Sequence, residues 1–76
     1  MFSMFSVKDK CLTIGGADPN RTCIFPFVFE GIKYSTCIKI ISYDINPWCS
    51  TMVDETGMHV SGQDKWGDCG PKCPMP

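Results

Sequence analysis

The chain has 76 residues, six of which are cysteines, and a formal net charge of −1. A domain of this length buries only about 60% of its unfolded surface, so its apolar core alone gives marginal stability. Cysteine at this density is typical of disulfide scaffolds. Neither sign of charge clusters, which disfavours nucleic acid or an anionic membrane as the main partner, because both require basic patches. No run approaches the roughly 18 apolar residues of a membrane span.

Residues 1–10, MFSMFSVKDK, are expected to form a flexible N-terminal tail, because they offer little beyond two phenylalanines that could pack. Their apolar run is too short for a signal peptide and has no basic segment before it. Residues 11–21, CLTIGGADPNR, are rich in turn-forming residues. Within them, Asn20 begins an N-x-[ST] triplet, so we predict a glycan on Asn20 in a surface loop.

Residues 23–38, CIFPFVFEGIKYSTCI, contain the β-branched and aromatic side chains that are typical of strands. Two short strands are predicted, at residues 28–29 and 33–38. A turn at Glu30-Gly31 is expected to join them.

The FPF piece of this stretch is predicted to be a bend or a sheet edge, because Pro26 has no N–H to donate to a strand ladder. We expect the rings of Phe25 and Phe27, which flank this bend, to pack inward. Phe29, in the following strand, is expected on a different face, and Tyr34 is expected to be structural.

The remainder of the chain shows no helical period of useful length and no internal repeat. Residues 50–67 are divided into turns by three glycines and contain His59, the sole histidine, with Asp54 and Glu55. We expect His59 to be a solvent-exposed loop residue and the two carboxylates to form a polar turn. Catalysis is not expected, because a chain this small offers no deep cleft that excludes water from a catalytic triad.

The cysteines could hold zinc instead of forming disulfides. Zinc sites use closely paired ligands such as C-x2-C, whereas the only close pair here is the C-x3-C of Cys69 and Cys73. Disulfides are therefore predicted, which implies an oxidising, secretory compartment. No metal and no cofactor are expected.

Three motifs follow one another in the chain: C-x-F-P-F-x-F-x-G-x-x-Y-x-x-C at 23–37, P-W-C-S-T at 47–51 and W-G-x-C at 66–69. Together they resemble the fibronectin type II module, a relative of the kringle. This resemblance implies a small, disulfide-rich fold, mostly irregular with short antiparallel β-strands. With two further cysteines, the chain looks like the six-cysteine forms of invertebrate secreted proteins, so we predict a module over 11–73 and a C-terminal tail at 74–76.

The resemblance also implies how the cysteines pair, which sequence alone leaves open. It implies Cys23–Cys49 and Cys37–Cys69, and with them Cys11–Cys73, which is the kringle order. In the chain-entropy model each bridge stabilises the fold by roughly 3.5 to 4.3 kcal/mol at most. A scaffold held in this way can leave aromatic side chains exposed for a ligand.

In type II modules, aromatic residues at the positions of Phe29, Trp48 and Trp66 line a shallow pocket, so the resemblance implies that these three bind ligand. The implied ligands are collagen- or gelatin-like chains or, in seminal-plasma members, choline headgroups. Phosphorylcholine is less favoured, because Phe29 stands where such modules often carry a phosphate-binding tyrosine and only Tyr43 could compensate. The alternative is that both tryptophans cover the disulfides as core.

The leading interpretation is a non-catalytic, secreted binding module for collagen, gelatin or another extended apolar ligand. The alternative is a regulatory module of a secreted serine protease cascade, which would dock another protein through the long insertion at residues 54–65 and the Cys11–Cys73 bridge. A stand-alone toxin or inhibitor is disfavoured by the lack of a basic cluster or an evident reactive-site loop.

Overall fold

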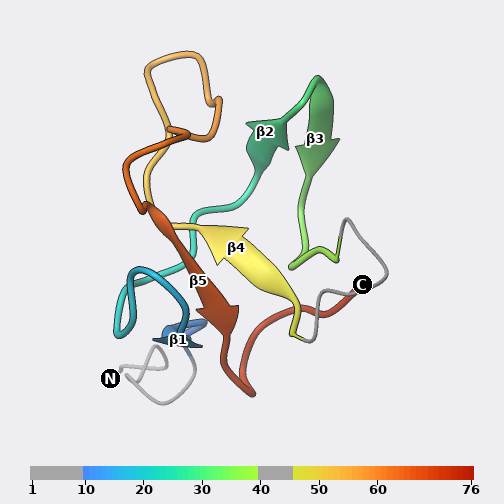
Figure 1. The fold of residues 1–76 in the computed structure, drawn as a ribbon. Coiled ribbons are helices and arrows are strands. Elements are labelled where there is room, and N and C mark those ends of the chain that lie inside the picture. The colour runs from blue at the N-terminus through green and yellow to red at the C-terminus, as the bar shows by residue number, and fades with distance from the viewer. Residues whose placement is uncertain (1–9, 40–45) are drawn as a thin grey trace, which may run out of the picture.

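The computed structural model describes residues 10–39 and 46–76, in which five short strands form two antiparallel sheets (Figure 1). One sheet has the order β1-β5-β4, and the other pairs β2 with β3. The bounds are β1 Thr13–Gly15, β2 Phe27–Phe29, β3 Ile32–Tyr34, β4 Trp48–Ser50 and β5 Trp66–Cys69. The predicted class, a small disulfide-rich domain with short antiparallel strands, is confirmed. Within the described ranges no helix is long and apolar enough to cross a membrane.

The hairpin of β2 and β3 turns at the predicted pair. Glu30 has φ 50° and Gly31 has φ 83°, and Phe29 pairs with Ile32 on either side of them. Positive φ at both central residues of a two-residue loop is the type I′ geometry, which suits the twist of the flanking strands. The turn prediction is therefore confirmed.

The predicted strand at 33–38 is wrong beyond Tyr34, where β3 ends in a bend. After the bend, the N–H of Cys37 donates to the carbonyl of Pro74 at 2.9 Å instead of to a strand partner in the hairpin. Cys37 is fully buried and bonded to Cys69, so the core position of this cysteine redirects the chain away from the hairpin. On the other strand, β2 begins one residue earlier than predicted, at Phe27.

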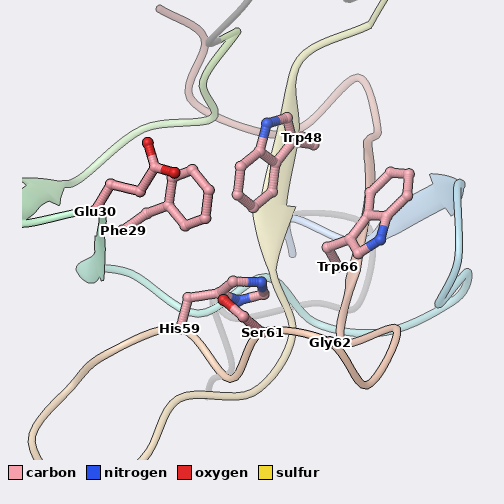
Figure 2. Close-up of a pocket in the computed structure, with 7 residues that line it drawn as sticks. All are labelled: Phe29, Glu30, Trp48, His59, Ser61, Gly62 and Trp66. Carbon is pink, nitrogen blue, oxygen red and sulfur yellow. The ribbon is translucent and has the colours of Figure 1, made fainter.

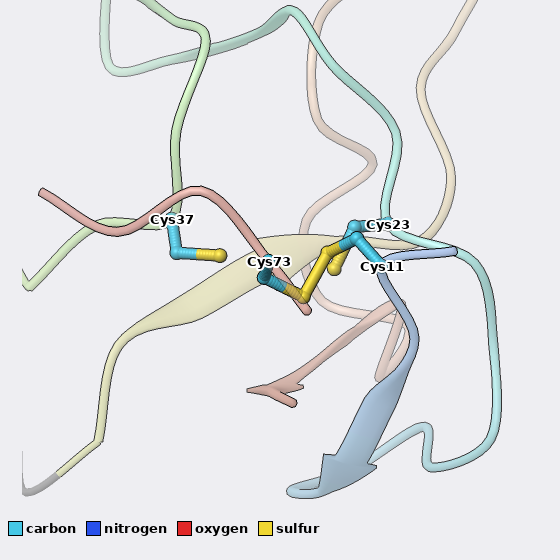
Figure 3. Close-up of side chains that lie close together, drawn as sticks. All are labelled: Cys11, Cys23, Cys37 and Cys73. Atoms are coloured by element: carbon cyan, nitrogen blue, oxygen red, sulfur yellow. A yellow bond between two sulfur atoms is a disulfide. The ribbon is translucent and has the colours of Figure 1, made fainter. Parts of the chain in front are cut away.

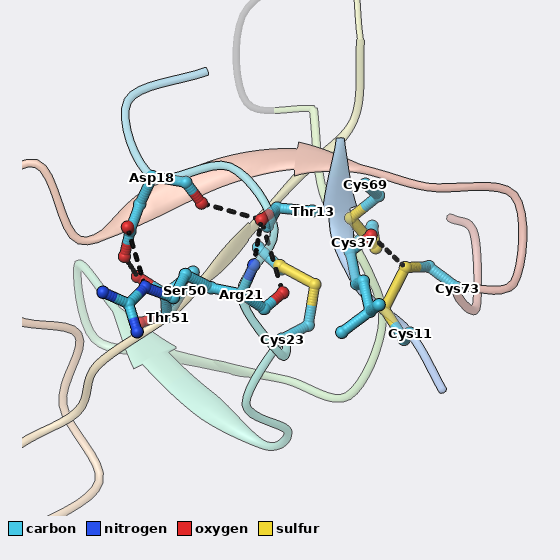
Figure 4. Close-up of a disulfide and its surroundings, with 12 residues drawn as sticks. Cys11, Thr13, Asp18, Arg21, Cys23, Cys37, Ser50, Thr51, Cys69 and Cys73 are labelled. Carbon is cyan, nitrogen blue, oxygen red and sulfur yellow. Dashed lines mark hydrogen bonds and ion pairs between the residues drawn. A yellow bond between two sulfur atoms is a disulfide. The ribbon is translucent and has the colours of Figure 1, made fainter. Parts of the chain in front are cut away.

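The central strand β5 and the edge strand β1 approach each other closely around Thr13. Thr13 is fully buried; its hydroxyl donates to the carbonyl of Asp18 at 2.7 Å and accepts the N–H of Arg21 at 2.9 Å (Figure 4). A Cβ on Gly67 would lie 2.6 Å from the methyl carbon of Thr13, so only glycine fits there without displacement. These contacts close the loop at residues 11–21 onto the sheet.

Three disulfides form the centre of the molecule: Cys11–Cys73, Cys23–Cys49 and Cys37–Cys69. They are the pairs that the resemblance implies. One sulfur from each of four cysteines gathers within 4.8 Å in a group drawn in Figure 3, comprising Cys11, Cys23, Cys37 and Cys73. Every cysteine is bonded to another, and a disulfide sulfur is not the thiolate that zinc takes as a ligand. The gathering is therefore a packing of bridges.

Phe27 is the largest fully buried side chain in the described part of the chain. Its ring centroid lies 6.2 Å from that of Phe25 and 5.7 Å from that of Tyr34, and both of these rings pack partly buried against the core. Phe25 and Phe27 thus point inward as expected. The peptide bond between Phe25 and Pro26 is cis.

Phe29, however, does not lie on a different face from Phe27. The two are separated by one residue in β2, so both side chains point to the same side of the strand. The ring centroid of Trp48 lies 5.1 Å from that of Phe29 and 5.6 Å from that of Phe27. The predicted N-terminal tail at 1–10, apart from Lys10, and Tyr43 lie outside the described residues.

Candidate functional site

An open pocket of about 510 Å³ lies between the two sheets and the insertion (Figure 2). The three aromatic residues singled out in the sequence all line it, Phe29 from β2, Trp48 from β4 and Trp66 from β5. The hairpin turn contributes Glu30, and the insertion contributes three further residues, His59, Ser61 and Gly62. The aromatic residues of the pocket thus come from three strands that are distant in the sequence.

The aromatic rings form a continuous wall with Trp48 at its centre. Phe29 and Trp48 meet edge to face, with centroids 5.1 Å apart and an interplanar angle of 89°. Trp48 and Trp66 meet at 6.4 Å and 77°. Edge-to-face pairs add about 0.5–1.5 kcal/mol beyond the effect of area burial, so each ring holds the next in place. Trp66 keeps 36% of its surface exposed, which leaves an aromatic face available to a partner.

Backbone pairing and a glycine set the positions of the two tryptophans. Trp48 exchanges two backbone hydrogen bonds with Ile38, each 3.0 Å long, and is adjacent to the bonded Cys49. Trp66 lies over Gly16, where a Cβ would come within 2.7 Å of the indole. Gly16 also has φ 78°, a conformation that glycine adopts without strain. The small residue therefore makes room for the Trp66 ring.

His59 is part of the pocket wall, and the prediction that it is a solvent-exposed loop residue is wrong. The insertion pairs with β2: the N–H of Val28 donates to the carbonyl of Gly57 at 2.9 Å, and the N–H of His59 donates to the carbonyl of Val28 at 2.8 Å. This pairing brings the imidazole to 5.5 Å from Trp48 and 5.8 Å from Phe29, measured between centroids. No local pattern in the sequence marks the contact, because it depends on backbone groups of a distant strand.

The imidazole of His59 is held by a hydrogen bond with the hydroxyl of Ser50. The Oγ atom of Ser50, which is fully buried in β4, lies 2.7 Å from Nδ1 of His59. Burial lowers the pKa of His59 below its ordinary value of 6.5, because the charged ring loses hydration. At neutral pH the pocket therefore presents a neutral imidazole.

The tip of the insertion is the polar turn that the sequence predicts. Oδ1 of Asp54 accepts hydrogen bonds from the hydroxyl of Thr56 at 2.6 Å, from the N–H of Thr56 at 2.8 Å and from the N–H of Met58 at 3.0 Å. These bonds, that of the Thr56 hydroxyl first, lower the pKa of Asp54. Asp54 therefore stabilises its own turn and does not point its charge at the pocket.

The predicted glycan acceptor lies on the surface. Asn20 is exposed with φ 61°, and its N–H donates to the carbonyl of Thr13 at 3.0 Å. The side chain is free to carry a glycan, and glycosylation of Asn20 stays a prediction.

The geometry of the site suits binding more than bond making. The Ser50 hydroxyl beside His59 is fully buried, so a substrate could not reach it as it would reach a serine nucleophile. What the pocket offers instead is an aromatic wall, one carboxylate from Glu30 and one imidazole. Such surfaces hold proline rings, aliphatic side chains or cations.

Comparison with known proteins gives one family and several relatives. The model of the fibronectin type II domain matches residues 23–69. The chain is 36% identical to canine matrix metalloproteinase-9 over 61 residues, 80% of this chain and 8% of that protein. It is 33% identical to the chicken 72 kDa type IV collagenase over 65 residues, 86% of this chain and 9% of that protein.

A third relative is the human cation-independent mannose-6-phosphate receptor, 38% identical over 52 residues, 68% of this chain and 2% of that protein. The chain thus spans less than a tenth of the length of these three curated relatives. No solved structure matches it significantly.

Proposed function

Because the chain belongs to the fibronectin type II domain family, we propose that it is a non-catalytic, secreted module that binds extended, largely apolar chains such as gelatin or collagen. A disulfide-rich module of this family is typical of extracellular proteins. The observation that carries the proposal is the convergence of Phe29, Trp48 and Trp66 on one open pocket. Proline rings and aliphatic side chains stack on such aromatic faces.

The relatives support this class of ligand. One of them is named a type IV collagenase, and this chain aligns with a segment of it over 86% of its own length. Single pockets of this size bury little surface, and association costs several kcal/mol, so an isolated module is expected to bind weakly. Repeated modules or an attached domain would add affinity through effective concentration.

The test is a nuclear magnetic resonance titration with an end-capped, single-chain peptide of Gly-Pro-Pro repeats and, separately, with phosphorylcholine. We expect the peptide to shift the indole signals of Trp48 and Trp66 saturably. Trp66→Ala should weaken binding at least fivefold, because it removes an exposed wall of the pocket. Ile14→Ala is the matched control, since Ile14 is an exposed apolar side chain on β1, 65% exposed, that does not line the pocket.

Three outcomes contradict the proposal. Equal binding by wild type and Trp66→Ala would place the ligand elsewhere. If neither ligand shifted the indole signals of Trp48 and Trp66, the two rings would have a structural role only. Shifts with phosphorylcholine alone would change the ligand class to a choline headgroup.

A second candidate function is protein docking through the insertion. The hairpin around the Val53–His59 bridge leaves two apolar side chains exposed, Met52 at 44% just before the insertion and Met58 at 48% within it. Glu55→Lys tests this candidate better than a change at Asp54, whose carboxylate stabilises the turn. If Glu55→Lys no longer bound a secreted protease but still bound the peptide, the result would favour protein docking.

A further inference from the structure

His59 is the one histidine among the described residues that line the pocket, and its ring lies beside the aromatic wall (Figure 2). We propose that His59 contacts the bound chain and sets its charge preference: the neutral imidazole admits an uncharged extended ligand, and the imidazolium disfavours it. Binding then depends on the protonation of a residue that the insertion supplies. The inference rests on the proposed function and deepens it.

Ser50 allows His59 to change its charge without losing its anchor. The Ser50 hydroxyl has one proton and two acceptors within reach, Nδ1 of His59 at 2.7 Å and the carbonyl of Met52 at 2.9 Å. The Met52 carbonyl already accepts the N–H of Val60 at 3.0 Å. A carbonyl oxygen accepts two hydrogen bonds, so the hydroxyl can donate to the Met52 carbonyl when Nδ1 carries the ring proton, or to Nδ1 when the ring proton is on Nε2. Either neutral tautomer of His59 keeps its contact with Ser50.

Protonation of His59 also keeps this contact. Nδ1–H of the imidazolium donates to Oγ of Ser50, and the hydroxyl donates to the Met52 carbonyl. Both contacts exist in one geometry, so the imidazole can gain a proton while its ring stays in place. The proton changes the charge of the pocket wall and leaves its shape unchanged.

The surroundings of His59 hold few charges that could offset this one. From β2 it faces Phe27 and Phe29, from β4 Trp48 and Ser50, and across its own hairpin Val53. Glu30, in the turn after β2, is the one charged side chain that lines the pocket with it among the described residues. Glu30 is exposed to solvent, so its attraction for an imidazolium is screened.

The direction of the effect follows from desolvation. A neutral chain that covers the pocket removes water from His59, which costs more for the imidazolium than for the imidazole. The bound state therefore has a lower pKa at His59 than the free state, and binding displaces a proton. Affinity should be constant above the free pKa and fall below it, with a limiting slope of about tenfold per pH unit.

The experiment uses the oxidised chain and the capped Gly-Pro-Pro peptide. It measures how pH changes the dissociation constant and how the bound peptide changes the pKa of His59. The peptide carries no titratable group, so any pH dependence belongs to the protein. We expect its dissociation constant to be the same at pH 8 and pH 7.5 and several-fold higher at pH 5. The pKa of His59, followed by its ring signals, should fall when the peptide is saturating.

Two variants assign the effect. His59→Phe keeps an aromatic ring in the wall and should bind with an affinity that does not change between pH 8 and pH 5. Should that variant not fold, His59→Gln serves the same purpose. Glu30→Gln is the charge control and should keep the pH dependence, because the dependence comes from the imidazole.

The outcomes separate this inference from the proposed function. Binding at pH 8 with the same pH profile in wild type and His59→Phe would overturn the inference and leave the proposed function intact. A pKa of His59 that stays constant or rises on saturation would overturn it as well. Absence of peptide binding at every pH would overturn both.

Discussion

A buried hydroxyl holds the histidine of the pocket in place, and burial of the ring lowers its pKa. Ser50 is fully buried in β4, and its Oγ contacts Nδ1 of His59 and the backbone of Met52. Burial without a charged partner lowers the pKa of His59, since the imidazolium loses hydration that nothing in the wall replaces. The lowered pKa of His59 has a consequence for the stability of the free protein.

The unfolding free energy of the oxidised protein should decrease as the pH falls from about 6.5. His59 has a lowered pKa in the folded chain and its ordinary value of 6.5 when unfolded, so between the two values the unfolded chain binds more protons. The unfolding free energy therefore has its full value above pH 6.5, decreases between the two pKa values and stays reduced below the pKa of the folded chain. Denaturant unfolding at pH 8 and pH 5 measures the difference, and His59→Phe should abolish its histidine component. A wild-type curve that is flat over this range would contradict the assignment.

At the level of elements, the contact between β1 and β5 leaves no space for a side chain on Gly67. In Gly67→Ala the new Cβ would lie 2.6 Å from the Thr13 methyl carbon and 2.9 Å from the carbonyl oxygen of Asp18. We expect a loss of about 1–3 kcal/mol of unfolding free energy, as for overpacking of a core. The amide signals of Thr13 and Asp18 should shift with it.

Gly31→Ala is the control for this variant. A Cβ on Gly31 meets no atom within 4 Å, but φ is +83°, so the change costs backbone strain of about 1 kcal/mol and no packing. Signals of Thr13 should not move. A Gly67→Ala protein with wild-type stability would show that β1 can shift away from β5 without cost.

How far the sequence predicts these elements depends on the range of the interaction that forms them. Gly31 adopts the positive φ of the turn without strain, and cysteine spacing with the aromatic motif indicates the family, so both predictions succeed. β1 pairs with β5 more than 50 residues later through Thr13 and Cys69, and nothing local in three-residue strands indicates this partner. The strand predicted to reach Ile38 fails for the same reason, because a distant disulfide decides where Cys37 lies.

The residues of the candidate site also differ in how far the sequence predicts them. Phe29, Trp48 and Trp66 lie in motifs that the family resemblance marks, and the structure gathers them in one pocket. His59 lies in an insertion outside those motifs. Its place depends on backbone hydrogen bonds of Gly57 and His59 to Val28, in which any residue but proline could donate from position 59. A polar sequence context therefore gives no indication that its ring is half-buried among aromatics.

For the whole molecule, the Cys11–Cys73 bridge should contribute stability more than binding. The family match ends at residues 23 and 69, inside this bridge, and neither cysteine lines the pocket. In the double variant Cys11→Ser with Cys73→Ser we expect unfolding free energy to fall by about 2–4 kcal/mol, the usual range for a disulfide. Denaturant unfolding measures this loss, and the peptide titration at neutral pH should give an unchanged dissociation constant. A folded double variant that no longer binds would mean that the bridge shapes the pocket.

The same bridge determines how the module responds to mechanical load. The Cα atoms of Cys11 and Cys73 lie 4.5 Å apart although 62 positions separate them in sequence. Tension that pulls the backbone before Cys11 away from the backbone after Cys73 would be transmitted through the disulfide between them. The sheets and the pocket between these cysteines would carry none of that force. The fold between the two cysteines would therefore keep its shape under such tension until a reductant opens the bond.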